Sequence, residues 1–249
     1  MELTVLGAGT CVPVEGYSPA GYVLRRAEEV VLIDAGPGTL ARLERAGIHY
    51  RDLKLVLFSH LHPDHTLDLV TLLQANNATP GWKRSEPLQV AGPRGMRRFM
   101  ERLYQAFEGI APEAYEIRVD ELAESQHDIG GWHLATGLTG HTPNSLGYRV
   151  EAEGRTVVFS GDAADVEPLA RLAQGADLLV CECSFPQGWP TSDHLTAAQA
   201  GQVAQAAGVK RLLLTHLYPP ALAQDPARQA QAIFTGKVDL ARDGYTTDV

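Results

Sequence analysis

The six residues 60–65 read His-Leu-His-Pro-Asp-His, and their position restricts the fold more than any other feature of the chain. They directly follow residues 55–58, a short apolar run that predicts a buried strand. Pro63 suits the first turn of a helix, so a helix is predicted to begin there. Three imidazoles and a carboxylate therefore lie between a strand and a helix, where open α/β sheets place their binding sites. The apolar stripe predicted for this helix consists of Leu67, Val70 and Leu73.

The same arrangement recurs twice along the chain. Residues 156–159 form an apolar run that leads to Asp162, and residues 212–214 form one that leads to His216. In all three places the run ends at a serine or threonine before the ligand-type residue follows. His141, between a glycine and a threonine, adds a fourth turn of this kind. Together these turns supply five histidines and two aspartates, enough to hold two metal ions if Asp162 bridges them.

A mixture of imidazole nitrogens and carboxylate oxygens is the donor set that zinc accepts most readily. Without a cation, three imidazoles and a carboxylate so close together would repel one another on protonation and would be costly to desolvate. The sequence therefore predicts a metal site. Three further histidines have no neighbours that complete a site and are predicted to be core residues and not ligands, namely His49, His127 and His133.

The pattern H-x-H-x-D-H, followed by a single His, Asp and His in that order, resembles the metallo-β-lactamase superfamily. The resemblance covers nearly the whole chain, from the Leu-Gly-Ala-Gly-Thr of residues 6–10 to Thr215-His216. It implies an α/β fold, a four-layer αββα sandwich. It also implies one domain over residues 1–249, with two similar halves of about 1–128 and 129–249.

The same resemblance implies two zinc ions, with Mn²⁺ or Fe²⁺ as possible replacements. One ion would be held by His60, His62 and His141, the other by Asp64, His65 and His216, and Asp162 would be shared. In the family pattern Asp34 orients these ligands. Asp64 is also expected to take part in catalysis.

The second half of the chain resembles the RNase Z group of that superfamily, through residues 177–185 and 192–200. In that group a Glu is paired with a His-Ser/Thr element, which implies catalytic roles for Glu182 and His194. His194 would bind a phosphate oxygen or protonate a leaving group, and Glu182 would hold its tautomer. A histidine that merely caps a helix is the alternative. Asp193 is the predicted N-cap of the helix that follows.

RNase Z carries a long arm between the ligand His and the bridging Asp, and this arm grips tRNA. Only 20 residues separate His141 from Asp162, enough for a hairpin. The net charge of −9 also argues against extended nucleic acid as a partner. We therefore predict a dinuclear zinc hydrolase, a phosphodiesterase that cleaves a small or cyclic phosphodiester through a metal-bridging hydroxide. The alternatives are a tRNA 3′ processing endoribonuclease, an arylsulfatase or lactonase, and a mononuclear iron persulfide dioxygenase.

Two short basic segments contain Lys83, Arg84, Arg97 and Arg98. They are predicted to be solvated surface, and the alternative is that they face an anionic substrate. Leu69, Leu72 and Leu73 are predicted to lie either in the core or in a homodimer interface.

The chain opens on a predicted strand, without the basic and apolar regions of a signal peptide. No apolar run approaches the roughly 20 residues of a membrane helix. A cytoplasmic protein that does not contact membranes is expected. The three cysteines are accordingly predicted to be reduced, with a third metal site at Cys181 and Cys183 as the less favoured alternative.

Overall fold

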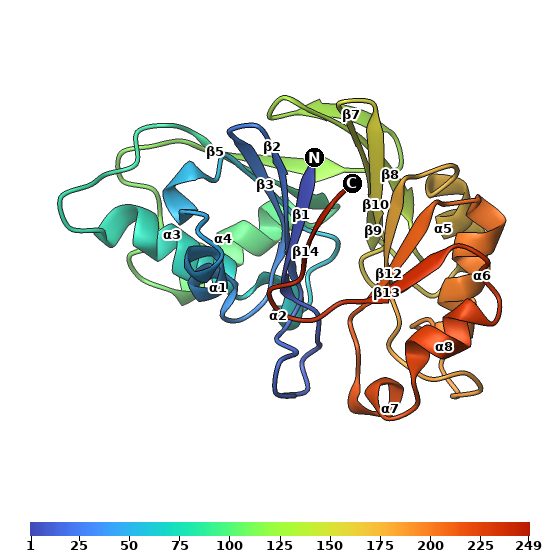
Figure 1. The fold of residues 1–249 in the computed structure, drawn as a ribbon. Helices are drawn as coiled ribbons and strands as arrows, with labels where there is room; N and C mark the ends of the chain where they lie inside the picture. Colours follow the sequence, from blue (N-terminus) through green and yellow to red (C-terminus); the bar gives the residue numbers. More distant parts are fainter.

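The computed structural model describes residues 1–249 as two seven-stranded sheets packed face to face, with helices on both outer faces (Figure 1). The first sheet contains, in spatial order, β14 (Thr246–Asp248), β1 (Glu2–Gly7), β2 (Gly21–Arg26), β3 (Glu29–Ala35), β4 (Leu55–Leu57), β5 (Leu88–Pro93) and β6 (Ile117–Leu122). The second contains β13 (Lys237–Leu240), β12 (Arg211–Thr215), β11 (Leu178–Glu182), β10 (Arg155–Phe159), β9 (Leu146–Ala152), β8 (Trp132–Leu138) and β7 (Gln126–Ile129). The predicted αββα sandwich is confirmed.

Each sheet is parallel on one side and antiparallel on the other. Strands β3 to β6 pair in parallel, as do β10 to β13, while the remaining neighbours are antiparallel. The central parallel strands β4 and β11 are buried along their whole length, because sheet and helices cover both of their faces. This explains why the sequence shows unbroken apolar runs there rather than alternation.

The helices form the two outer layers. The first sheet is covered by α1 (Thr39–Arg45), α3 (Asp68–Ala78) and α4 (Met96–Ala106), and the second by α5 (Val166–Leu172), α6 (Ala197–Ala207) and α8 (Pro226–Gln231). Three single-turn helices lie between these elements: η1 (Tyr50–Asp52), α2 (Pro63–Thr66) and α7 (Pro219–Leu222).

Three apolar clusters correspond to the three interfaces between layers. The central cluster lies between the sheets and includes the buried rings of Trp132 and Tyr148. Burial of such large side chains is worth roughly 1.5–3 kcal/mol each. Tyr148 on β9 also donates a hydrogen bond to the carbonyl of Phe58 at 2.7 Å, and the Leu146 amide donates to the carbonyl of Ser59 at 2.8 Å. These two bonds fasten the end of β4 to the second sheet, directly before the six-residue motif.

The helix predicted from Pro63 is interrupted. The short α2 ends at Thr66, Leu67 follows it, and α3 begins at Asp68. Leu67 is 42% exposed, so the predicted stripe of Leu67, Val70 and Leu73 is wrong at its first position. The buried positions of α3 are Leu69, Leu72, Leu73 and Asn76, so the three leucines left open between core and interface lie in the core.

Helix α6 begins three residues later than predicted. Its N-cap is Thr196, whose hydroxyl accepts from the Gln199 amide while the Gln199 side chain accepts from the Thr196 amide. The prediction of Asp193 as N-cap is wrong, because this reciprocal capping box satisfies two amides at once. The helix ends at Gly208 in the left-handed conformation.

The chain passes from the first sheet to the second between β6 and β7, inside residues 123–125. The C-terminal strand β14 does not lie in the sheet that contains the rest of the second half of the chain. Strand β14 returns to the first sheet, where it pairs with β1. The two termini consequently lie near each other (Figure 1).

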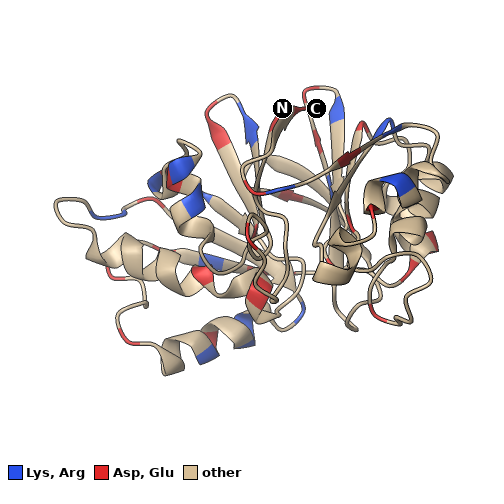
Figure 2. Cartoon of the chain, turned by 60° about the horizontal axis from the view of Figure 1, so that its bottom comes forward, with Lys and Arg blue, Asp and Glu red and all other residues tan.

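Acidic and basic residues alternate along the outer elements of the chain (Figure 2). Lys83 is exposed and lies 3.9 Å from Glu113. Arg84 is only 2% exposed and donates to the carbonyls of Leu53, Glu86 and Pro87. The prediction that Arg84 belongs to a solvated or substrate-facing basic segment is therefore wrong. Its guanidinium instead joins Leu53 to residues 86 and 87 through hydrogen bonds.

All three cysteines are free thiols, and Cys181 and Cys183 are buried in the apolar cluster under α6. Neither belongs to a group of metal-ligand side chains, so the alternative of a third metal site there is not supported. None of the helices combines the length and the apolar character that crossing a membrane would require.

Candidate metal centre

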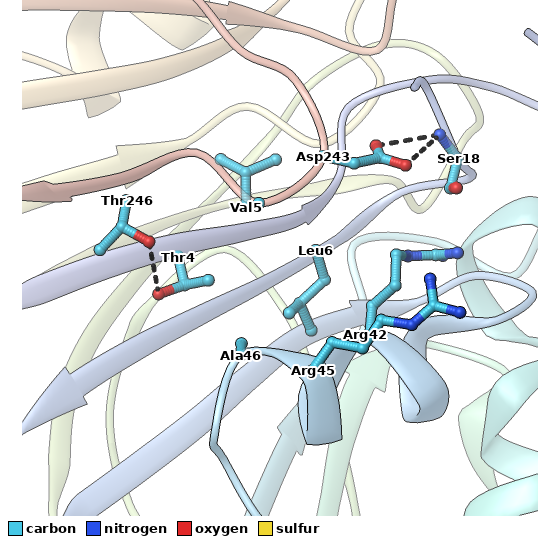
Figure 3. Close-up of a pocket in the computed structure, with 10 residues that line it drawn as sticks. Thr4, Val5, Leu6, Ser18, Arg42, Arg45, Ala46, Asp243 and Thr246 are labelled. Atoms are coloured by element: carbon cyan, nitrogen blue, oxygen red, sulfur yellow. Dashed lines mark hydrogen bonds between the residues drawn. The ribbon is translucent and has the colours of Figure 1, made fainter. Parts of the chain in front are cut away.

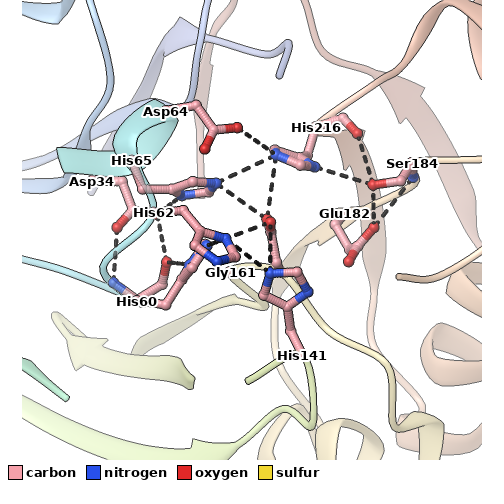
Figure 4. A network of polar contacts seen from close by, with 12 residues as sticks. Asp34, His60, His62, Asp64, His65, His141, Gly161, Glu182, Ser184 and His216 are labelled. Carbon is pink, nitrogen blue, oxygen red and sulfur yellow. Dashed lines mark hydrogen bonds and ion pairs between the residues drawn. The ribbon is translucent and has the colours of Figure 1, made fainter. Parts of the chain in front are cut away.

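The side chains singled out in the sequence come together at the edge where the two sheets meet (Figure 4). Strand β4 leads to His60, β10 leads to Asp162 and β12 leads to His216. His141 follows β8, next to a single bridge between Gly140 and Ala163. The convergence follows from the topology, because the carboxyl ends of parallel strands point to the same edge of a sheet.

The first ligand group consists of His60, His62, His141 and Asp162. His60 Nε2 lies 2.9 Å from His62 Nδ1, and His141 Nε2 lies 3.2 Å from the same atom. Asp162 Oδ2 lies 3.6 Å from the Nε2 atoms of both His60 and His141. His62 thus faces its neighbours through Nδ1, whereas the other two histidines use Nε2.

The second ligand group contains Asp64, His65 and His216. The Nε2 atoms of His65 and His216 are 3.3 Å apart, and Asp64 Oδ2 lies 3.7 Å from His216 Nε2. Asp162 reaches this group through its other oxygen, because Oδ1 lies 3.3 Å from His65 Nε2 and 3.4 Å from His216 Nε2. The Asp162 carboxylate therefore stands between the two groups.

These separations fit metal ions. Ligands at about 2.0–2.1 Å from a tetrahedral ion are separated from one another by about 3.3 Å, which matches the spacing in both groups. Asp162 Oδ1 is buried and has no hydrogen-bond partner. Burying a carboxylate oxygen that has no hydrogen-bond donor costs free energy unless that oxygen coordinates a cation. The donor set of five imidazoles and two carboxylates is suited to two divalent ions.

In four of the five ligand histidines, the ring nitrogen that faces away from the ligand group lies next to an oxygen atom. His65 Nδ1 lies 2.8 Å from Asp34 Oδ2, His141 Nδ1 lies 2.7 Å from the carbonyl of Asp193, and His60 and His216 each meet a serine hydroxyl at 3.1 Å. An N–H directed at oxygen fixes the tautomer and leaves Nε2 as the lone-pair donor. All four rings are therefore prepared to bind a cation through Nε2.

The two serines are themselves held by buried carboxylates. Ser59 donates to Asp34 Oδ2 at 2.8 Å, and Ser184 donates to Glu182 Oε2 at 2.6 Å. The chain thus uses the same carboxylate–serine–histidine arrangement on both sides of the centre. The predicted orienting role of Asp34 fits these contacts. The roles of Ser59 and Ser184 were not predicted, because the sequence does not indicate which histidine or carboxylate a serine hydroxyl contacts.

Electrostatic coupling within the centre is strong. Burial lowers the pKa of His60 to about 2, and the neighbouring histidines reinforce this effect. Burial alone would also lower the pKa of His65, but Asp162 and Asp34 on either side raise it well above its usual value. Burial would raise the pKa of Asp162, yet His216, His65 and His60 hold it well below its usual range. Asp162 is therefore ionised and available as an anionic ligand.

His194 approaches the centre from the loop before α6 and belongs to neither of the two groups above. Its Nδ1 lies 3.0 Å from Oε1 of the fully buried Glu182, which also accepts from the Ala163 amide at 2.7 Å. One of its ring nitrogens lies within 4.8 Å of ligand atoms of Asp162 and His216. Burial would lower the pKa of His194, but the hydrogen bond and charge of Glu182 outweigh it and raise the pKa to about 9. His194 is therefore a protonated imidazole at neutral pH in the absence of metal.

An aromatic wall, formed by Phe185, Trp189 and Tyr218, stands beside His194. The Phe185 ring is stacked between Trp189 and Tyr218, at centroid distances of 5.3 and 5.2 Å. An open cavity of about 640 Å³ is lined by Phe185, Tyr218 and residues 190–194. This wall was not predicted, since its rings come from separate loops.

His49, His127 and His133, to which no site was assigned, lie outside the groups of metal-ligand side chains. His133 is exposed and meets Asp128 at 2.8 Å, and His49 meets Glu44 at 3.0 Å. His127 contacts the carbonyl of Ala123. The prediction that they are core residues is wrong, because His133 is exposed and His49 and His127 are only partly buried.

Residues 29–217 match the family model described as a β-lactamase superfamily domain. A ribonuclease Z of Mycobacterium marinum is 30% identical to the chain, and the alignment covers 100% of this chain and 99% of that protein. Two crystal structures are similar in fold. One is the metallo-β-lactamase fold protein YhfI of Bacillus subtilis, with a TM-score of 0.85, 23% identity and coverage of 99% and 98% of the two chains. The other is the short form of human tRNase Z, with a TM-score of 0.77, 24% identity and coverage of 100% and 99%.

Proposed function

Because this chain belongs to the metallo-β-lactamase superfamily, we propose that it is a dinuclear, zinc-dependent phosphodiesterase that hydrolyses small or cyclic phosphodiesters. Two divalent ions bound at the centre would supply a water molecule of lowered pKa and a Lewis acid for the phosphoryl oxygens. The observation that carries the proposal is the pair of His194 and Glu182. It places an imidazole that is hydrogen-bonded to a buried carboxylate beside both ligand groups, without using it as one of the seven proposed ligands.

The chain's own residues divide the work. Asp34 and Ser59 on one side, and Glu182 and Ser184 on the other, hold the histidines in the tautomer that exposes Nε2. His194 is placed to give a proton to the leaving oxygen, because Glu182 stabilises its charged form. The backbone amides of Ala163 and Ser184 donate hydrogen bonds to the two carboxylate oxygens of Glu182 and hold this side chain in place.

Three features favour a small substrate over a tRNA precursor. Strands β9 and β10 are joined by a tight turn at Glu153 and Gly154, so the segment between His141 and Asp162 contains a hairpin and no arm. The net charge is −9, which disfavours the binding of an extended polyanion. The aromatic wall next to His194 suits a base or aryl group on the leaving side of the phosphodiester.

The second candidate is a tRNA 3′ processing endoribonuclease. The ribonuclease Z of M. marinum, similar over the full length, favours it. Such an enzyme would need a basic surface to replace the arm, and Arg171, which lines a cavity together with His141, is one cation near the centre.

A substrate panel tests the proposal. Metal-loaded enzyme should hydrolyse bis(p-nitrophenyl) phosphate and a cyclic nucleotide, and a metal chelator should abolish both activities. An aryl sulfate and a lactone, assayed at the same enzyme concentration, should react far more slowly. Faster hydrolysis of either of these two compounds would reject the phosphodiesterase assignment while leaving the metal centre intact.

A further inference from the structure

A second cavity lies away from the metal centre, between the end of α1 and the strands β1 and β14 (Figure 3). Its volume is about 350 Å³, which is in the range of small-molecule sites. None of the seven proposed metal ligands lines it. The lining includes two guanidinium groups, from Arg42 and Arg45, and the hydroxyl side chains Thr4, Ser18 and Thr246.

Neither of the two arginines forms an ion pair. Arg42 donates through Nη2 to the carbonyl of Pro37 at 2.9 Å, while its buried Nε has no hydrogen-bond partner. Burial, reinforced by the charge of Arg45, lowers the pKa of Arg42, and Asp243 and Asp68 only partly offset this effect. In Figure 3 both side chains run from α1 toward the end of the cavity that contains Ser18. Two like charges side by side, one with a buried donor left over, form an arrangement that a bound anion would stabilise.

The one carboxylate of the cavity is already engaged. Asp243 Oδ1 accepts from the amides of Ala8 and Ser18, and Oδ2 also accepts from Ser18, at 3.0–3.2 Å. Asp243 therefore fastens the loop after β1 to the loop before β14 and forms no ion pair with either arginine, although its charge acts on Arg42. The cavity keeps an excess of positive charge in a protein whose net charge is −9.

We propose that this cavity binds a small organic phosphate, with the phosphate group on Arg42 and Arg45 and the organic part toward the hydroxyls of Thr4 and Thr246. Guanidinium groups match the geometry of phosphate oxygens through paired N–H donors. The cavity is larger than inorganic phosphate needs, and the hydroxyls at its far end suit a sugar. The proposal concerns a site separate from the metal centre and does not depend on the reaction catalysed there.

Nuclear magnetic resonance of the ¹⁵N-labelled, metal-loaded protein tests the site directly. Titration with adenosine 5′-monophosphate should shift the amides of Ser18, Ala46 and Gly244 along one saturable curve. Inorganic phosphate should shift the same amides more weakly, and adenosine should not shift them. Any binding of the nucleotide at the metal centre would appear separately, at the amides around His62 and Asp64.

Arg45 offers the decisive variant, because no hydrogen bond or ion pair of its side chain occurs in the structure. Arg45→Gln should keep the spectrum of the folded protein and weaken the nucleotide affinity read at Ser18 and Gly244 by about tenfold or more, the cost of a lost charge-assisted hydrogen bond. Arg45→Lys should restore part of it, and the surface control Arg171→Gln should leave it unchanged. The proposal would be overturned if millimolar nucleotide did not shift the cavity amides of the wild-type protein. It would also be overturned if Arg45→Gln bound the nucleotide with the same affinity as the wild type.

Discussion

Most of the ligand histidines are oriented through one ring nitrogen, while the other ring nitrogen faces the metal site. Four rings are fixed by an oxygen on Nδ1, and His62 is the exception that faces the centre through Nδ1. His194 belongs to neither ligand group, and its Nδ1, like that of His65, meets a buried carboxylate. A buried carboxylate next to an imidazole favours the charged ring. The proposed roles of His65 as ligand and His194 as acid therefore follow from the position of each ring relative to the two ligand groups, and not from the Nδ1 partner alone.

The first prediction concerns His194→Asn. This change should leave both metals and the fold in place and should lower kcat by about 10² to 10⁴ for a substrate with an alkoxide leaving group, the usual worth of a positioned acid. The loss should be much smaller for bis(p-nitrophenyl) phosphate, whose leaving group needs little protonation. His133→Asn, at an exposed histidine, is the matched control. Loss of metal, or equal slowing of both substrates through KM alone, would contradict the acid role.

The pH dependence of kcat follows from the same contact. The pKa of His194 is raised to about 9 by Glu182, and bound cations nearby would lower it again, so the acid is protonated on the low-pH side of that value. For the alkoxide leaving group, kcat should fall as pH rises through this pKa, at or below about pH 9. The alkaline limb should disappear in His194→Asn. A limb that persists unchanged in the variant would assign it to another group.

Strand ends and turns determine where the ligands lie. At the end of β10, Gly161 has a φ of 56°, and a Cβ atom placed there would lie 2.6 Å from Cβ of Ser59. The turn that presents Asp162 thus packs against the serine that orients His60. Only glycine combines this backbone conformation with so close an approach.

Two glycine substitutions separate these effects. Gly175→Ala, at a φ of 66° with nothing within 4 Å, should lower the free energy of unfolding by about 1 kcal/mol through backbone strain alone. Gly161→Ala should cost about 1–3 kcal/mol more, because it adds the clash with Ser59. Urea denaturation of the metal-free proteins measures both. Equal destabilisation would mean that the turn relaxes freely and that the close packing of Gly161 on Ser59 is unimportant.

The sequence predicted the strand–ligand turns well because each combines an apolar run with an unusual cluster of ligand types. The sandwich and the pairing of Glu182 with His194 came from the resemblance to a family. The break between α2 and α3 was hidden, because the leucine pattern continues through Leu67. Asp193 and Thr196 are both good N-caps in isolation, and only the contact with Gln199 decides between them. Burial of Arg84 depends on carbonyls brought in by distant loops, which a local pattern does not record.

Over the whole molecule, two sheets each contribute ligands to one centre, and Asp162 stands between the two ligand groups. Purified, metal-loaded protein should contain close to two divalent ions per chain, as measured by elemental analysis. Asp162→Ala should lose at least one of them, because it removes a ligand from both groups, while circular dichroism should show an intact fold. Full occupancy by two ions in this variant would rule out the bridging position of Asp162.

Metal content also separates the enzyme classes that share the motif. A protein that retains one iron with an optical spectrum of its own, instead of two ions, would indicate a persulfide dioxygenase. The seven closely spaced ligands predict otherwise, since one tetrahedral ion needs four at most.

Substrate size tests the central claim most directly. The protein has two groups of metal-ligand side chains, a hairpin where RNase Z has an arm, and a net charge of −9. We therefore predict that kcat/KM, measured at matched salt with one metal-loaded preparation, is higher for a cyclic nucleotide than for a tRNA precursor with a 3′ trailer. Efficient trimming of the tRNA precursor at a single site, together with slow hydrolysis of the cyclic nucleotide, would contradict the account and favour the endoribonuclease.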